Sequence, residues 1–199
     1  TTTNANGAYE FENIVAGNYF LRVMTPTNYV YSPAHVGDPL TDSDITGTMG
    51  AGTTGFFQVV PGEDRMDIDA GMYICSRVSG YLWYDYLMND RKDNFENGMN
   101  GLFVELWRNV NGTFEKVAQA TTGRQPGTAS EDGYFNFPCV PPGEYYLRVD
   151  LPLIGLVRVR PNIGNDPTRD SDLTNANGPM TTNTFNLSPG QHKSDLAGG

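Results

Sequence analysis

An ordered internal repeat is the sequence feature that most constrains how this chain of 199 residues can fold. The segment Gly7–Phe11 recurs as Gly133–Phe137, an offset of 126 residues (133 − 7). Further along, the acidic triplet 42–44 recurs as 170–172, an offset of 128 (170 − 42), so two residues are inserted near 150–164. Because the matches keep one order along the chain, we expect two copies of one structural unit.

The first copy lacks counterparts of about residues 76–126. We therefore expect residues 1–73 to be the C-terminal half of one domain, residues 74–77 a short linker, and residues 78–199 a nearly complete second domain. The chain also begins with Thr1 rather than Met, which suggests a piece of a longer polypeptide. A half sheet exposes its core face and an unpaired edge, so strands from the preceding chain or an adjacent subunit should complete it.

Short β-prone runs separated by turn residues predict an all-β fold. The Asn111-Gly112 pair between two such runs is a typical hairpin turn, and no segment keeps a helical period for three turns. About seven short strands in 120 residues indicate tandem Ig-like (prealbumin-like) antiparallel β-sandwich domains. The expected strands are Val78–Tyr84, Leu102–Val110, Thr113–Ala120, Tyr134–Phe137, Glu144–Asp150, Leu156–Arg160, Thr182–Leu187 and His192–Leu196.

The charge and the residue pattern exclude several classes of function. A net charge of −10 argues against nucleic acid as a partner, because phosphate binding needs clustered Lys and Arg. The sequence contains no run of about twenty apolar residues, so we expect no membrane span. His35 and His192 lack a nucleophile at a matching spacing, and Trp83 and Trp107 lie on expected strands as packing residues. We therefore expect no enzymatic activity.

The segment 85–96 has the spacing of a twelve-residue calcium loop. Calcium takes six to eight oxygen ligands, which such a loop supplies from positions 1, 3, 5, 7, 9 and 12. With Asp85 as position 1, the expected ligands are Asp85, Asn89, the Arg91 carbonyl, Asp93 and Glu96. Leu87 at position 3 offers no side-chain oxygen, and Asp90 replaces the usual turn glycine. The alternative is a solvated acidic loop without an ion.

The ordered motifs around this loop resemble a known family. They are Gly80-x-x-Trp83-x-Asp85, Asp93-x-x-Glu96-x-Gly98-x-x-Gly101, Gly133-Tyr134-Phe135-Asn136-Phe137, Pro142-Gly143-x-Tyr145 and Asp67-x-Asp69-Ala70-Gly71-Met72-Tyr73. This set looks like the B-type repeats of serine–aspartate-repeat and collagen-adhesin-like bacterial surface proteins. The resemblance implies β-sandwiches, calcium-binding loops, rod-like stacking and a cell-surface setting.

Two further acidic clusters resemble the second acidic cluster of that family. Clustered carboxylates repel one another unless cations or protons neutralise them, whereas the alternative is turns in which Asp side chains bind backbone amides. In the second copy, Ala197 replaces the counterpart of Asp69. The candidate calcium ligands in these clusters are Asp38, Asp42, Asp44, Asp67 and Asp69 in the first copy, and Asp166, Asp170 and Asp172 in the second.

The two cysteines, Cys75 and Cys139, lie next to expected strands, and we expect them to form a disulfide, with two free thiols as the alternative. The first copy has Asn13 at the position that matches Cys139, so the pair is specific to the second copy.

The sequence as a whole predicts a calcium-stiffened structural repeat of a large extracellular protein on the bacterial cell surface. Such a repeat would serve as a stalk segment or as a polymer unit of a filament, with neighbouring repeats or adjacent subunits as its partners. The alternative is a binding module that recognises a carbohydrate or a protein ligand.

Overall fold

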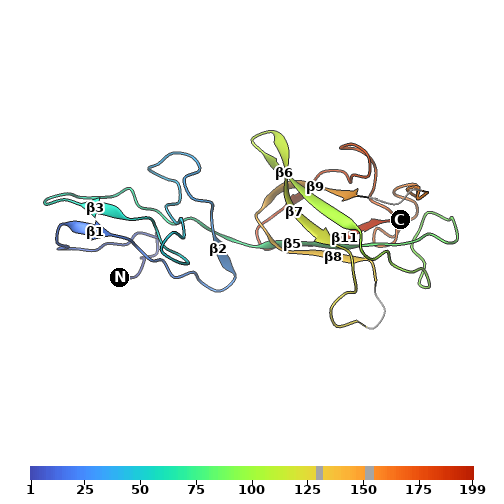
Figure 1. Cartoon of the computed structure of the whole chain (residues 1–199), viewed down its shortest axis with the longest axis horizontal. Coiled ribbons are helices and arrows are strands. Elements are labelled where there is room, and N and C mark those ends of the chain that lie inside the picture. The colour runs from blue at the N-terminus through green and yellow to red at the C-terminus, as the bar shows by residue number, and fades with distance from the viewer. Residues whose placement is uncertain (129–131, 151–154) are drawn as a thin grey trace. The chain divides into compact units, whose positions relative to one another are not determined.

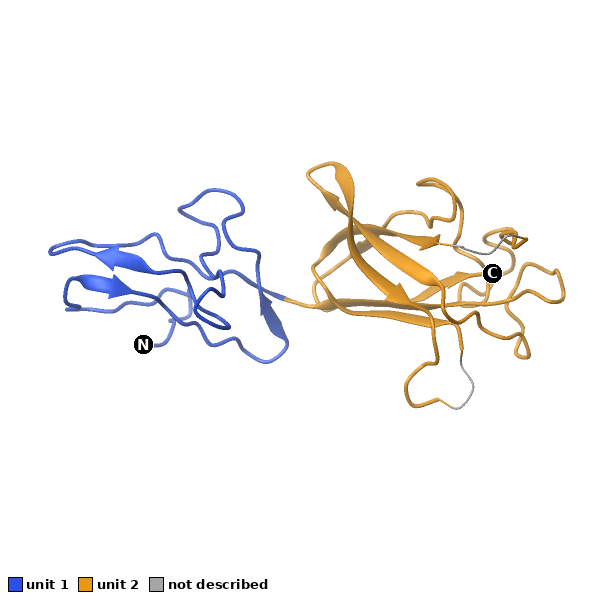
Figure 2. Ribbon diagram, in the orientation of Figure 1, with its two compact units in different colours: residues 1–73 blue, residues 74–199 orange. Residues whose placement is uncertain are grey.

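The computed structural model describes residues 1–128, 132–150 and 155–199, and these residues contain strands and no helix. Within this part of the chain, no helix is long and apolar enough to cross a membrane. The described residues form two compact units, Thr1–Tyr73 (unit 1) and Ile74–Gly199 (unit 2), coloured separately in Figure 2. The predicted all-β fold class is confirmed.

Unit 2 is a β-sandwich of two sheets, whose layers can be followed in Figure 1. One sheet has the strand order β10-β9-β6-β7 and the other the order β11-β5-β8. The strands are β5 (Ser76–Leu82), β6 (Phe103–Val110), β7 (Thr113–Thr121), β8 (Tyr134–Val140), β9 (Gly143–Asp150), β10 (Phe185–Leu187) and β11 (His192–Gly198).

The core of unit 2 lies between these sheets and follows the two-residue period of the strands. On β6, Val104 and Leu106 are fully buried, while Phe103 is 41% exposed on the other face. Tyr145 on β9 is also fully buried, and its hydroxyl donates to the Pro141 carbonyl at 2.6 Å. Burying each apolar side chain of this size stabilises the fold by about 1.5–3 kcal/mol.

The pairing of β11 differs from the expected all-antiparallel sandwich, because β11 runs parallel to β5. The two backbones approach so closely that a Cβ on Gly80 would collide with the Leu196 carbonyl oxygen, which explains the glycine at this position of β5. The expected linker 74–77 is largely strand, since β4 (Met72–Ile74) ends and β5 begins on either side of Cys75.

The strand expected over Leu156–Arg160 does not form, so this prediction is wrong. Within the described residues, these five residues pair with no strand, and their backbone makes a bond from Val159 N to Gly199 O at 3.1 Å. A β-prone run becomes a strand only where another strand pairs with it. The strand expected over Thr182–Leu187 is also shorter, because only β10 forms a continuous ladder with β9, while Thr182 makes a separate backbone bond to Leu147.

Unit 1 repeats part of this architecture in the same register. Its strand β1 (Gly17–Tyr19) pairs with β3 (Phe57–Val59) through Gly17↔Val59 and Tyr19↔Phe57. In unit 2, β9 pairs with β10 through Gly143↔Leu187 and Tyr145↔Phe185, the same register at the repeat offset. Unit 1 also contains β2 (Tyr29–Tyr31), which pairs with β4.

Buried threonines give both units the same hydrogen bonds. Thr53 donates to Gly50 O and Thr181 to Gly178 O, each at 2.7 Å. The next threonine, Thr54 or Thr182, accepts a backbone N–H at 3.0 Å in both units. The sequence repeat is thus a repeat of local structure as well.

Unit 1 lacks the sheet that β5 centres in unit 2. Residues 8–14 and 64–70, the counterparts of β8 and β11, form no strand. In unit 2 both of those strands pair with β5, which has no counterpart in residues 1–73. Phe11 is consequently 51% exposed, against 4% for its counterpart Phe137. Unit 1 therefore presents a core face without the strands that cover it in unit 2.

Candidate metal sites

The loop after β5 folds its predicted ligands onto its own backbone. Asp85 accepts hydrogen bonds from Asn89 N at 3.2 Å and from Asp90 N at 2.7 Å. Glu96, only 6% exposed, accepts from Asp93 N at 2.8 Å and from Leu87 N at 3.4 Å. The side chains of Asn89 and Asp93 are joined at 2.8 Å.

The two departures from the usual loop pattern have different consequences. Asp90 has a φ of 63°, the left-handed conformation for which a glycine is normally chosen, so the turn still forms. Leu87 supplies no side-chain oxygen, although its N–H binds Glu96. The loop thus offers three carboxylates and one amide, an all-oxygen set that fits calcium, with one ligand fewer than usual.

Two arginines from the segment after residue 155 bind this loop, and the sequence reasoning missed both. Arg169 donates to Asp93 Oδ1 at 2.8 Å and to the Lys92 carbonyl at 2.6 Å. Arg160 binds Asp90 with its guanidinium at 2.6 Å, and its N–H bond is the main cause of the lowered pKa of Asp90. Both arginines lie more than 65 residues from their partners, and no local motif signals them. Arg169 would compete with a cation for Asp93.

In the described residues, one trio of His, Cys, Asp or Glu brings its ligand atoms within 4.8 Å of one another: His35, Asp42 and Asp44. The sequence reasoning treated His35 as an ordinary surface residue; its ring Nδ1 lies 3.9 Å from Asp44 Oδ1. The carboxylates of the 85–96 loop are not gathered this closely, so a cation there would have to draw them together.

The other candidate ligands of unit 1 lie outside this trio. Asp38 is exposed, and its carboxylate accepts from Leu40 N at 3.0 Å. Asp67 forms an ion pair with Arg65 at 2.9 Å. Asp69 joins the cluster through its backbone, donating to Asp44 Oδ2 at 2.8 Å.

This last bond recurs in unit 2, where Ala197 N donates to Asp172 Oδ2 at 2.8 Å. The third residue of each acidic triplet therefore ties its loop to the end of its unit across 25 positions. The replacement of Asp69 by Ala197 leaves this bond unchanged, because the donor is backbone.

The local turn caps of the alternative occur instead at Asp38 and Asp166, which accept from the N–H two residues on. Asp166 also accepts from the Thr168 hydroxyl, which holds the pKa of Asp166 below its usual value.

The acidic cluster of unit 2 is partly buried, and burial raises the pKa of two of its carboxyls. Burial is the main cause for Asp170, and the charges of Asp166 and Asp195 add to it. Burial likewise raises the pKa of Asp172 to about 6, against the opposing effect of the Ala197 N–H. Asp170 and Asp195 raise it further, and Lys193 lowers it. An ionised Asp172 is therefore costly here without a cation.

We expect the stability of unit 2 to depend on pH through Asp172. Because the folded pKa is raised above the unfolded value of about 3.9, protonation contributes stability that is complete below about pH 4 and is lost as the pH rises through 6. In chelator, Asp172→Asn should be more stable than wild type at pH 7, by on the order of 1–3 kcal/mol, and equal to it at pH 4. Urea melts at each pH measure this, with Glu115→Gln on exposed β7 as control, and parallel pH profiles for wild type and Asp172→Asn would refute it.

Comparisons with known proteins match nearly the whole chain to one domain family. The family model described as "SdrD B-like domain" matches residues 1–72 and again residues 76–199. The chain is 30% identical over 175 residues to serine-aspartate repeat-containing protein F of Staphylococcus epidermidis (strain ATCC 12228 / FDA PCI 1200). It is 32% identical over 177 residues to serine-aspartate repeat-containing protein C of Staphylococcus aureus (strain Newman). Both alignments cover 86% of this chain, but only 10% and 16% of those two relatives.

Proposed function

The chain belongs to the SdrD B-like domain family, and we propose that it is a tandem structural repeat of a much larger adhesin displayed on the outer surface of a bacterial cell. In this proposal the units act as a stalk or as the unit of an extracellular filament, and calcium bound by their acidic loops stiffens the array. The proposal assigns the chain no catalytic activity.

The observation that carries the structural role is the repetition itself. Both units keep the same buried threonine bonds and the same strand register, and a single residue, Cys75, separates β4 from β5. Modules built on one framework and joined by short connections are typical of repeat arrays, in which stability comes from the modules and their neighbours.

Support for calcium comes from the chemistry of the loops. Hydrogen bonds within the loop involve all four side chains that offer oxygen ligands, Asp85, Asn89, Asp93 and Glu96. Glu96 is buried and has no ion pair in the described structure. A divalent cation would neutralise these carboxylates and replace hydrogen bonds within the loop. Without it, repulsion over about a Debye length, roughly 8 Å, would loosen the loop.

The alternative, a module that binds a carbohydrate or a protein, has an aromatic cluster on unit 2 as its natural site. Trp107 stacks on Tyr146 with ring centroids 5.8 Å apart, and Phe114 covers the same tyrosine. Tyr146 is consequently only 8% exposed. The rings cover one another rather than facing a ligand, and we therefore favour the structural role.

Calcium should stabilise unit 2 through the 85–96 loop. At a hundredfold excess over its dissociation constant, one site contributes about 2.7 kcal/mol, because the ion binds only the folded state. We expect thermal melts in calcium and in chelator to differ by this amount for wild type and for Glu115→Gln, which removes an exposed carboxylate of β7. The difference should vanish in Glu96→Gln, whatever the stability of that variant in chelator.

The calcium-minus-chelator difference separates ligand loss from structural damage, because damage alone shifts both melts together. Equal wild-type melts in calcium and chelator would overturn the calcium role. An equal calcium effect in wild type and Glu96→Gln would move the ion to another loop.

A further inference from the structure

Strands β5 and β11 of unit 2 lie side by side and run in the same direction. Their register places Arg77 opposite His192 at one end and Leu82 opposite Gly198 at the other. The chain from unit 1 enters at the start of β5, whereas the chain leaves β11 at the opposite end of the pair. A pull on the chain through these two points therefore draws the two strands past each other along their length.

The pairing of β5 with β11 is suited to resist such a pull. Backbone hydrogen bonds run across the strands, so a force along the strands acts on the whole ladder at once. Further bonds hold the start of β5, where the force enters. Arg77 N donates to Gln191 O at 2.8 Å, and the hydroxyl of the fully buried Ser76 donates to Ser188 O at 2.7 Å.

The disulfide between Cys75 and Cys139 lies at the same point. Cys75 directly precedes β5, and Cys139 lies near the end of β8, which pairs with the edge of β5 that faces away from β11. The bond therefore fastens β5 to β8, and a pull at Cys75 acts on both strands. It also closes the intervening 64 positions of the chain into a covalent ring.

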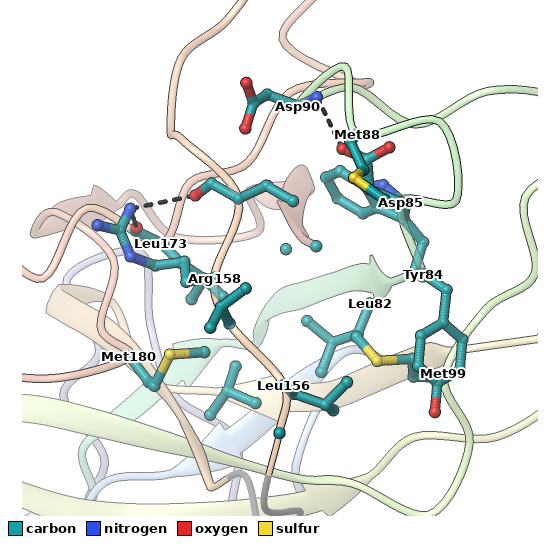
Figure 3. Close-up of a pocket in the computed structure, with 17 residues that line it drawn as sticks. Leu82, Tyr84, Asp85, Met88, Asp90, Met99, Leu156, Arg158, Leu173 and Met180 are labelled. Carbon is teal, nitrogen blue, oxygen red and sulfur yellow. Dashed lines mark hydrogen bonds between the residues drawn. The ribbon is translucent and has the colours of Figure 1, made fainter.

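The candidate calcium loop 85–96 belongs to this ring. Figure 3 shows the end of β5 at Leu82, then Tyr84 and Asp85, and the hydrogen bond from Asp90 N to the Asp85 carboxylate. All of these residues lie between the two cysteines in the chain. An external pull cannot lengthen a closed ring, so the loop carries no tension even after unit 2 has unfolded.

We propose that unit 2 is a load-bearing module, in which the parallel pair β5–β11 resists a pull on the chain and the disulfide limits the extension once this pair yields. Of the 124 positions between Cys75 and Gly199 (199 − 75), the disulfide withholds 64 and leaves 60 free to extend (199 − 139). The inference rests on the proposed structural role and gives it a mechanism that does not depend on calcium. Measured in chelator, its failure would leave the calcium-dependent melts as they are, and unresponsive melts would not alter the extensions.

Optical tweezers test the limit on extension, with the full chain held by peptide tags at its two ends. Reduction should increase the contour length released by unit 2 by about 210–230 Å, since each of the 64 freed positions spans about 3.3–3.6 Å. The variant Cys75→Ala/Cys139→Ala should release the longer length with and without reductant. Equal lengths for the oxidised and the reduced chain would overturn the proposal.

Two matched variants test whether β5–β11 is the pair that resists the pull. Ser76→Ala removes the hydroxyl bond at the start of β5, whereas Thr122→Val removes the bond from the buried Thr122 hydroxyl to Met99 O, away from both strands. Under constant force, Ser76→Ala should unfold about fivefold faster than wild type and Thr122→Val within about twofold of it, because forced unfolding follows the barrier on which the force acts. Equal acceleration by both variants, or release of unit 2 in a series of small steps, would overturn the proposal.

Discussion

Loss of the disulfide between Cys75 and Cys139 should lower the free energy of unfolding of unit 2 by about 4 kcal/mol in the chain-entropy model. The structure joins these residues across a separation of 64 positions, with their Cα atoms 4.8 Å apart. The bond lies beside the Ser76↔Val140 pair, where the ladder between β5 and β8 begins. It therefore closes a large loop in the unfolded chain while adding to a pairing that the folded chain already contains.

The measurement is a denaturant melt of Cys75→Ala/Cys139→Ala against oxidised wild type. Reduced wild type serves as a second comparison that leaves side-chain volume unchanged. Both should lose stability by a similar amount. Two alkylatable thiols in unreduced protein, or equal midpoints for all three samples, would contradict the prediction. Unit 1 has Asn13 in place of Cys139, so the hydrogen exchange of its backbone amides should not respond to reduction of the disulfide.

The sequence was sufficient for the strands whose pattern is local. Asn111 and Gly112 both have positive φ values, 53° and 88°, as the tight hairpin turn between β6 and β7 requires. The alternation of buried and exposed residues on β6 was equally readable. These features depend on neighbouring residues, and so β6 and β7 were predicted within one residue of their observed ends.

Features that depend on distant partners were not predictable in the same way. The run Leu156–Arg160 has strand composition, but pairing decides whether it becomes a strand, and composition does not name the partner. The parallel pairing of β11 with β5 likewise joins segments more than 100 residues apart. Sequence periodicity says which face is buried and not which neighbour lies alongside.

The candidate metal site also combines features that the local sequence predicts with features that depend on distant residues. Spacing within one loop predicted a shared role for Asp85, Asn89, Asp93 and Glu96, and the hydrogen bonds of the loop involve all four, although their carboxylates are not gathered around one point. The arginine that binds Asp93 arrives from 76 positions away, and only the folded chain reveals that this carboxylate already has a cationic partner. Calcium binding in competition with Arg169 stays a prediction, which the melts in calcium and in chelator test.

Unit 1 should become fully ordered only when strands equivalent to β5, β6 and β7 cover it. Phe11 and Ile14 are 51% and 47% exposed, while their counterparts Phe137 and Val140 are 4% and 5% exposed beneath the strands that unit 1 lacks. Burying two such side chains is worth about 3–6 kcal/mol, which is a large share of the stability of a small domain. Strands from the preceding chain or from an adjacent subunit would both meet this need.

A direct test places a second copy of residues 76–126 immediately before Thr1, which restores the order found in unit 2 because Gly127 is the counterpart of Thr1. Hydrogen exchange across residues 9–23 should be fast in the chain of 199 residues and strongly slowed in the fusion. The matched control carries serine at the copied positions of Val104 and Leu106, both fully buried in unit 2, and should leave exchange fast. Strong protection of residues 9–23 in the monomeric 199-residue chain would contradict this prediction, because it would show that unit 1 is stable without the added strands.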